Sequence, residues 1–286
     1  MERHILIDMG VYDEISCFYE SVRTEKRVIG KSWFGRNIYA VKRGAGSPVG
    51  IAVYAVHGRE FITARLAVEQ YFAGGVLGSV WFIPLANPDG AEISQAGLDG
   101  VPKERREEFL RAFGGAEYSL WKANGLGVDL NVNFDADWGT GVKNVRVRGS
   151  ENCIGDCPFS ERESLAIKNF TQEISPDYTV SYHTKGEEIY WRYFQKGERL
   201  KRDFRIASAL SLATGYPLRE AKGSAGGYKD WCVQKLKIPA VTVEAGKDCF
   251  AHPLGREAWL DIKERNLDGL RAVAQAVEKE LRGKRD

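Results

Sequence analysis

The chain of 286 residues lacks the features that mark membrane-spanning, secreted and nucleic-acid-binding proteins. No uninterrupted apolar stretch is long enough to span a bilayer. The first residues, 1–8, contain no apolar core of the kind that a secretion signal needs, which predicts a cytoplasmic protein. Basic and acidic residues nearly balance at a net charge of +2, and this argues against a nucleic acid or a membrane surface as a partner.

Cysteine is scarce and odd in number, with five residues at Cys17, Cys153, Cys157, Cys232 and Cys249. An odd count in a long chain suits a reducing compartment better than a disulfide framework. Cys153 and Cys157 are spaced like half of a metal site, but no matching Cys or His pair accompanies them, so we interpret them as thiols in a loop. The chain also lacks a Pro- or Ser-rich linker and any repeat, and its 43% hydrophobic content predicts one globular domain over residues 1–286.

Apolar, β-branched runs alternate along the chain with segments of helical periodicity. The pattern predicts strands at 38–42, 50–56, 80–85, 178–182 and 240–244, and helices at 60–73, 161–174, 201–213 and 256–281. Ser160 and Glu163 have the spacing of a capping box at the start of the second of these helices. Such alternation predicts a mostly parallel sheet with helices on both faces. Segments 87–124 and 139–155 are predicted to be loops that frame a site.

Side chains with metal-binding chemistry lie where the predicted strands end. His57 follows one strand, and Glu60 lies three residues later, on the same side of the following turn. His183 follows a second strand, and Glu244 ends a third. Two histidines and a glutamate form an open zinc set that leaves one position for water, and strand ends line the ligand crevice of open α/β sheets. The competing interpretation, two unrelated surface or core histidines, requires chance to place two of the four histidines at strand ends.

Short motifs strengthen the metal hypothesis through their order and spacing. They are H-G-R-E at 57–60, N-P-D-G at 87–90, G-V-D-L-N at 127–131, S-Y-H-T at 181–184, D-W at 230–231 and T-V-E-A at 242–245. With these motifs the chain resembles the zinc carboxypeptidases of the carboxypeptidase A type, from about residue 30 to the last predicted helix. Within that family it looks most like the bacterial γ-D-glutamyl-L-diamino acid endopeptidases, which cut peptidoglycan stem peptides, through segments 121–124, 185–191 and 227–232.

The resemblance implies a three-layer α/β/α sandwich with a mixed, twisted sheet in one domain, and one Zn²⁺ per chain. It assigns the zinc to His57, Glu60 and His183. Asp129 would accept the ring N–H of His57, although an aspartate at that place is also a common turn former. Glu244 would take a proton from the zinc-activated water and pass it to the leaving nitrogen, unless it is an ordinary carboxylate facing solvent.

Lys122 takes the place of the arginine with which the family stabilises the oxyanion. A lysine offers a compact point charge without the bidentate fork of arginine, and it can still serve as an electrophilic catalyst.

The substrate-binding positions depart further from the family. Arg59 matches an arginine that contacts substrate, although it can equally pair with a neighbouring acid. Asn131 matches a residue that binds the terminal carboxylate of the substrate, but its usual arginine partner is replaced by Val132. Lys222 stands at the place of the family's mobile tyrosine, and Tyr228 is a nearby candidate for substrate binding. Without the guanidinium, the grip that makes a strict C-terminal exopeptidase is missing.

These expectations predict a zinc metallopeptidase that hydrolyses the γ-D-glutamyl–diamino acid amide bond of peptidoglycan stem peptides, with a peptide as its partner. An N-acyl amino acid deacylase and a general metallocarboxypeptidase remain alternatives, because both use the same zinc set. A non-catalytic zinc- or peptide-binding module is a third, against which the presence of Glu244 argues.

Overall fold

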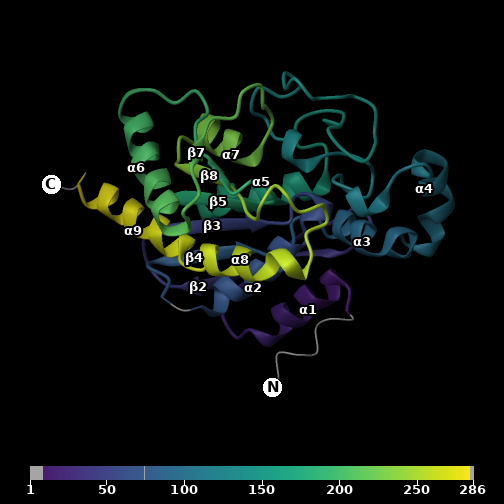
Figure 1. Cartoon of the computed structure of the whole chain (residues 1–286), viewed down its shortest axis with the longest axis horizontal. Helices are drawn as coiled ribbons and strands as arrows, with labels where there is room; N and C mark the ends of the chain where they lie inside the picture. Colours follow the sequence, from purple (N-terminus) through teal and green to yellow (C-terminus); the bar gives the residue numbers. More distant parts are fainter. Residues whose placement is uncertain (1–8, 74, 284–286) are drawn as a thin grey trace.

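The computed structural model describes residues 9–73 and 75–283, and an eight-stranded sheet lies at its centre (Figure 1). The strand order is β1-β2-β4-β3-β5-β8-β6-β7. The bounds are β1 Lys26–Lys31, β2 Asn37–Gly44, β3 Val49–Tyr54, β4 Ser79–Ile83, β5 Tyr178–His183, β6 Glu188–Tyr190, β7 Leu218–Arg219 and β8 Ala240–Glu244. The four central strands run parallel, and β6 and β7 also pair parallel, whereas the pairs β1–β2, β2–β4 and β6–β8 are antiparallel, so the sheet is mixed.

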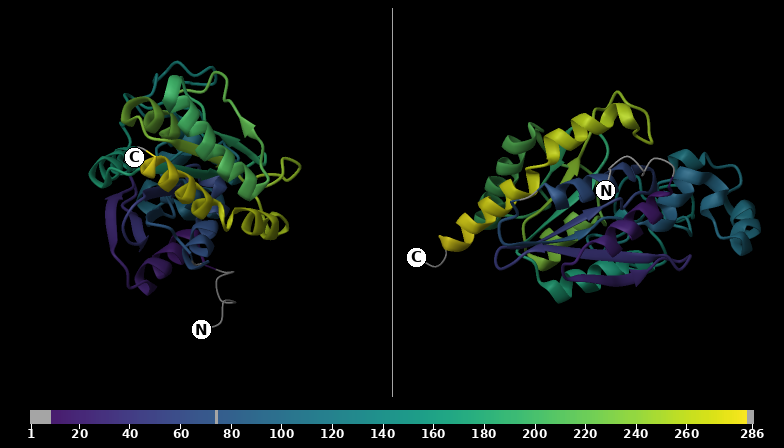
Figure 2. Two further views of the ribbon diagram at one scale, coloured as in Figure 1. Left: turned by 90° about the vertical axis from the view of Figure 1, so that its left-hand side faces the viewer. Right: turned by 90° about the horizontal axis from the view of Figure 1, so that it is seen from below.

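Two apolar cores lie on the two faces of this sheet. The central strands are buried on both faces, and alternate residues enter opposite cores, as Tyr54 and Val53 of β3 do. One face is covered by α2 Ile62–Phe72, α6 Gly197–Thr214, α8 Arg256–Asn266 and α9 Gly269–Arg282, and the other by α5 Arg162–Ile174 and α7 Tyr228–Trp231. The right-hand view of Figure 2 shows α8 and α9 above the sheet and α5 below it. The predicted three-layer α/β/α fold with a mixed sheet is therefore confirmed.

The predicted strands agree with the structure to within two residues at each end, and β8 agrees at both ends. The single helix predicted for 256–281 is wrong, because the chain turns between α8 and α9. The backbone carbonyl of Asn266 accepts a hydrogen bond from Gln70 Nε2 at 2.6 Å. A tertiary contact thus takes a carbonyl that a continuous helix would use.

The prediction of a loop over 87–124 is also wrong. The segment contains α3 Pro88–Ala96 and α4 Arg106–Phe113, which lie at the end of the molecule opposite the C-terminus (Figure 1). Asn87 caps α3 by accepting a hydrogen bond from the N–H of Gly90 at 2.9 Å. Segment 139–155 contains no named helix or strand within the described residues, in line with the predicted loop.

Three further differences concern the ends of helices and the chain termini. The predicted capping box is wrong, because Glu161 is the N-cap residue of α5 and the side chain of Glu163 accepts from Asn124 and the N–H of Trp33. The sequence pattern did not predict α1 Val11–Ser21 or β1. Residues 1–8, on which the prediction of no secretion signal depends, lie outside the described residues. Among the described helices, none has the length and apolar character needed to cross a membrane.

Candidate metal centre and active site

The turn that follows β3 brings His57 and Glu60 face to face. His57 precedes a single 3₁₀ turn, Gly58–Glu60, which leads into α2. His57 Nδ1 lies 2.8 Å from Glu60 Oε1. A Cβ atom at Gly58 would lie 2.3 Å from the carbonyl oxygen of Gly90, so only glycine allows this turn to pack against α3.

His183 and Glu244 are the last residues of β5 and β8, and the two are paired in register across this parallel ladder. His183 Nδ1 lies 3.0 Å from Glu60 Oε2 and 3.1 Å from His57 Nδ1. The adjacent ends of parallel strands therefore gather the predicted ligands and the predicted base at one edge of the sheet.

The group of His57, Glu60 and His183 fits a zinc ion. Its ligand atoms all lie within 4.8 Å of one another, and the three side chains are buried. Zinc–ligand distances of about 2.0 to 2.2 Å in a tetrahedron place ligand atoms roughly 3.3 Å apart, close to the spacing seen here. A buried carboxylate also needs a compensating charge, which a divalent cation supplies. Among the residues that the structure describes, this is the one group of three or more His, Cys, Asp or Glu side chains arranged to hold a metal ion.

Asp129 supports this group from behind. Its Oδ1 lies 3.2 Å from His57 Nε2 and accepts the N–H of Asn131 at 3.0 Å, while its Oδ2 accepts the N–H of Asn152. The fully buried carboxylate thus forms an Asx turn and also contacts the ring of His57. Asp129 therefore has the contacts of both roles that the sequence allowed, the turn former and the partner of His57. Burial opposes its charge, but Lys122 and His57 outweigh burial and hold the pKa of Asp129 well below its usual value.

Lys122 reaches the site, but its ammonium group is already paired. Its Nζ lies 2.9 Å from Asp129 Oδ2, and the side chain is 18% exposed. Burial would lower the pKa of Lys122, yet the attraction of Asp129 outweighs burial and raises it. The backbone of this segment is fixed to the metal turn, because the carbonyl oxygens of Lys122 and Trp121 accept the N–H groups of Gly58 and Arg59.

The surroundings of Glu244 shift the pKa of its carboxyl, as expected for a catalytic acid or base. Burial raises the pKa of its carboxyl to about 8; His183 opposes this rise and Glu60 adds to it by repulsion. Such a group exchanges a proton near neutral pH.

The predicted substrate-binding residues differ in where they lie. Asn131 is half-buried, and its Oδ1 accepts the N–H of Tyr228 at 3.3 Å. Arg59 Nη1 lies 3.8 Å from Glu151 Oε2, so the pairing with a neighbouring acid is present, but loose.

The assignment of Tyr228 to substrate binding is wrong. Its side chain is 1% exposed and packs in the core beneath α5, where its hydroxyl bonds to Thr171 Oγ1 at 2.9 Å. Only its backbone N–H, bonded to Asn131, faces the site.

A pocket of about 320 Å³ adjoins this centre on the side of Lys122. Amide and lysine side chains dominate its lining, together with one acid, Glu220, and the lining includes the three residues that depart from the family pattern, Lys122, Val132 and Lys222. These lining residues include Lys122, Lys143, Lys222, Asn131, Asn144 and Val132. We call this the inner pocket.

His252 lies near the centre, and the sequence alone assigned it no role. It lies in the loop after β8, close enough to Glu60, Arg59 and His57 for their charges to act on it. Burial is the largest influence and lowers the pKa of His252 to about 4, which keeps the imidazole neutral at neutral pH. Its only signal in the sequence is the rarity of histidine in the chain.

The sequence of the chain is similar to a known protein family and to proteins of known name. The family described as zinc carboxypeptidase matches residues 77–253, a span that begins after His57 and Glu60 and includes His183 and Glu244. Over 178 residues the chain is 30% identical to γ-D-glutamyl-L-diamino acid endopeptidase 1 of Lysinibacillus sphaericus, covering 60% of this chain and 43% of that protein. Over 131 residues it is 33% identical to murein peptide amidase A of Escherichia coli K12, covering 43% of this chain and 50% of that one. The matches thus span half or less of these two relatives' length.

Solved structures show the same fold. Bovine thrombin-activatable fibrinolysis inhibitor, solved with a tick carboxypeptidase inhibitor, superposes with a TM-score of 0.74 at 19% identity, over 94% of this chain and 95% of that one. The murein-tripeptide amidase of Escherichia coli O157 superposes with a TM-score of 0.60 at 20% identity, over 91% and 94% of the two chains.

Proposed function

Because the chain belongs to the zinc carboxypeptidase family, we propose that it hydrolyses the γ-D-glutamyl–diamino acid amide bond of peptidoglycan stem peptides. The observation that carries the proposal is the inner pocket beside the metal group. Its lining places Lys122, Lys222 and Asn131 around a space with no arginine in it.

His57, Glu60 and His183 would hold the zinc ion. When bound, zinc supplies a Lewis acid that polarises an amide carbonyl and acidifies a water molecule, and its charge favours the ionised form of Glu244. Asp129 keeps the ring of His57 oriented, because its Oδ1 faces His57 Nε2 at 3.2 Å.

Glu244 moves the proton. Its carboxylate accepts a proton from the attacking water and donates it to the leaving nitrogen of the diamino acid. Burial favours the protonated form of Glu244 that the second step needs, while the charge of bound zinc would favour the carboxylate that the first step needs. Lys122 holds a positive charge beside the reacting carbonyl, and its ion pair with Asp129 fixes the position of that charge.

The inner pocket selects the residue on the leaving side of the bond. A diamino acid such as diaminopimelate presents more than one carboxylate, and the lysines and amides of this pocket can meet these groups together. Each charged hydrogen bond contributes about 1.5 to 3 kcal/mol when it is shielded from water. A general carboxypeptidase relies instead on a bidentate guanidinium, and Val132 occupies that place here. The two curated relatives support this choice, since the names of both refer to diamino acid or murein peptides.

Side-by-side kinetics of three substrates test the proposal. They are L-Ala-γ-D-Glu-diaminopimelate, an α-linked dipeptide with a blocked N-terminus, and an N-acetyl amino acid. We expect the highest kcat/KM for the γ-linked tripeptide, with L-Ala-D-Glu as one product. A higher value for the blocked dipeptide would establish a general carboxypeptidase instead, and a higher value for the acetyl amino acid would establish a deacylase. The Glu244→Gln variant, purified in parallel, excludes a contaminating peptidase.

A further inference from the structure

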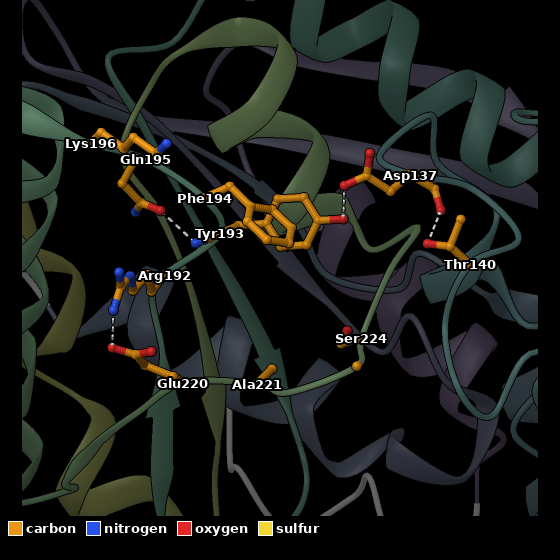
Figure 3. A pocket seen from close by; sticks show the side chains of 11 residues that line it. Asp137, Thr140, Arg192, Tyr193, Phe194, Gln195, Lys196, Glu220, Ala221 and Ser224 are labelled. Carbon is orange, nitrogen blue, oxygen red and sulfur yellow. Dashed lines mark hydrogen bonds and ion pairs between the residues drawn. The ribbon is translucent and has the colours of Figure 1, made fainter.

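A second, larger pocket adjoins the inner pocket, and Lys122 does not line it. It measures about 740 Å³, and the two pockets share Glu220, Ala221, Gly223 and Ser224 as lining residues. Figure 3 shows it from close by, with the hydroxyl of Tyr193 bonded to Asp137, Phe194 next to Tyr193, and Glu220, Ala221 and Ser224 of the shared segment along one side. We call it the outer pocket.

Segment 220–224 separates the two pockets, because four of its residues line both of them. Segment 220–224 lies between β7 and α7; its middle residue is Lys222, and the small residues Ala221, Gly223 and Ser224 flank it. The segment is held in place by a hydrogen bond from the N–H of Val142 to the carbonyl of Gly223 at 3.0 Å. The residues that line both pockets are small apart from Glu220, so an extended peptide that leaves the inner pocket can cross at Ala221, Gly223 and Ser224.

The charges of the outer pocket leave one cation without a partner. Arg192 Nη1 is paired with Glu220 Oε1 at 2.7 Å. Asp137 accepts hydrogen bonds from the hydroxyl of Tyr193 at 2.7 Å and from Gln234. Lys196 has no acidic partner among the residues that the structure describes, so the pocket offers a positive charge to an anion.

An exposed aromatic ring lines the same pocket as this cation. Phe194 is 75% exposed, and its backbone adopts a left-handed φ of 57°, a conformation that costs energy for a bulky residue. Its ring packs edge-on against Tyr193 with the centroids 4.9 Å apart. The pocket thus combines an apolar surface with an unpaired ammonium group, which matches a short peptide that ends in a free carboxylate.

We propose that the outer pocket binds the residues that follow the diamino acid in the substrate, with their terminal carboxylate at Lys196 and their side chains against Phe194. This inference rests on the proposed function, and it adds that the enzyme does not require the diamino acid to be the last residue. Asn131 lines the inner pocket without an arginine partner, so the bidentate clamp that holds a terminal carboxylate is missing there. The peptide then continues over segment 220–224 into the outer pocket.

A binding experiment tests this independently of catalysis. Zinc-loaded Glu244→Gln protein is titrated by calorimetry with L-Ala-γ-D-Glu-diaminopimelate and with the same peptide extended by D-Ala. We expect the extended peptide to bind about threefold to tenfold more tightly, as one partly solvated charged contact allows. In the same background, Lys196→Met and Phe194→Ser should bring the ratio of the two affinities close to one. Lys201→Met, an exposed lysine of α6 that pairs with Glu198 outside both pockets, should keep the ratio.

Equal or weaker binding of the extended peptide would overturn the inference, and so would a ratio that survives both Lys196→Met and Phe194→Ser. The proposed function fails separately, if wild-type protein does not cleave the γ-linked tripeptide. In that case the affinity ratio still decides what the outer pocket binds.

Discussion

Replacing Glu163 should change how the stability of the protein depends on pH. Glu163 is fully buried in the first turn of α5, and Asn124 Nδ2 donates to it at 3.3 Å and to Glu161 at 2.8 Å. Burial, together with the negative charge of Asp89, raises the pKa of Glu163 to about 8. This carboxyl therefore holds its proton in the folded protein at neutral pH.

The sign of the effect follows from proton binding. Between about pH 4.5 and pH 8 the unfolded chain releases the proton of Glu163 and the folded protein keeps it, so the free energy of unfolding falls as the pH rises through this window. Each pH unit corresponds to about 1.4 kcal/mol, which gives a loss on the order of 3 to 5 kcal/mol across the window. Ionisation of Glu163 also affects the active site, because Asn124, which donates a hydrogen bond to Glu163, anchors the segment that carries Lys122.

Glu163→Gln removes this titration while keeping the shape of the side chain. We expect the free energy of unfolding of the variant, minus that of wild type, to rise steadily from pH 5.5 to pH 8.5. Urea denaturation at several pH values, with saturating zinc throughout, measures this difference. Glu173→Gln is the matched control, since Glu173 lies on the same helix but is exposed and paired with Arg27. A difference for Glu163→Gln that stays constant across these pH values would refute the reasoning.

Three further substitutions test the site itself. His183→Ala should weaken zinc binding by more than about 100-fold, because even residues behind the ligands contribute 10- to 100-fold; metal analysis that finds zinc retained at full affinity would exclude His183 as a ligand. Glu244→Gln should retain zinc and lose about 10² to 10⁴ in kcat, the usual share of a general base, and near wild-type turnover would assign the proton to another group. Tyr228→Phe should leave kcat/KM within about twofold and cost about 1 kcal/mol of stability through the lost bond to Thr171; a large loss of activity would return Tyr228 to the site.

The strand ends that carry the chemistry could be predicted because their signal is local. In β5 and β8, β-branched and aromatic runs mark strands without reference to any other segment, and His183 and Glu244 follow directly from their positions. The start of α3 was also readable, since Asn87 followed by Pro88 is a strong N-terminal signal that the loop interpretation overlooked.

The rest depends on contacts between distant segments. The break between α8 and α9 depends on Gln70 of α2, nearly 200 residues away in the chain. Tyr228 begins a short helix, and only its packing against Phe134 and Trp231 decides that its ring turns into the core. The ion pair of Lys122 with Asp129 likewise could not be predicted from the sequence, because it forms only when the loop between the two residues is folded.

His183 and Glu244 are paired in register across β5 and β8, so the distance between the metal ligand and the base is fixed by the strand register. Side chains alternate faces along a strand, so a slip of one residue in β8 would turn Glu244 toward the opposite layer and put an apolar residue in its place. The backbone of β8 therefore cannot shift in small steps that would change the distance between His183 and Glu244. Substitutions in segment 220–224 or in 139–155, by contrast, leave the ladder untouched. Substitutions can therefore change the substrate specificity of this protein in small steps, whereas the arrangement of the metal ligand and the base is either retained or lost.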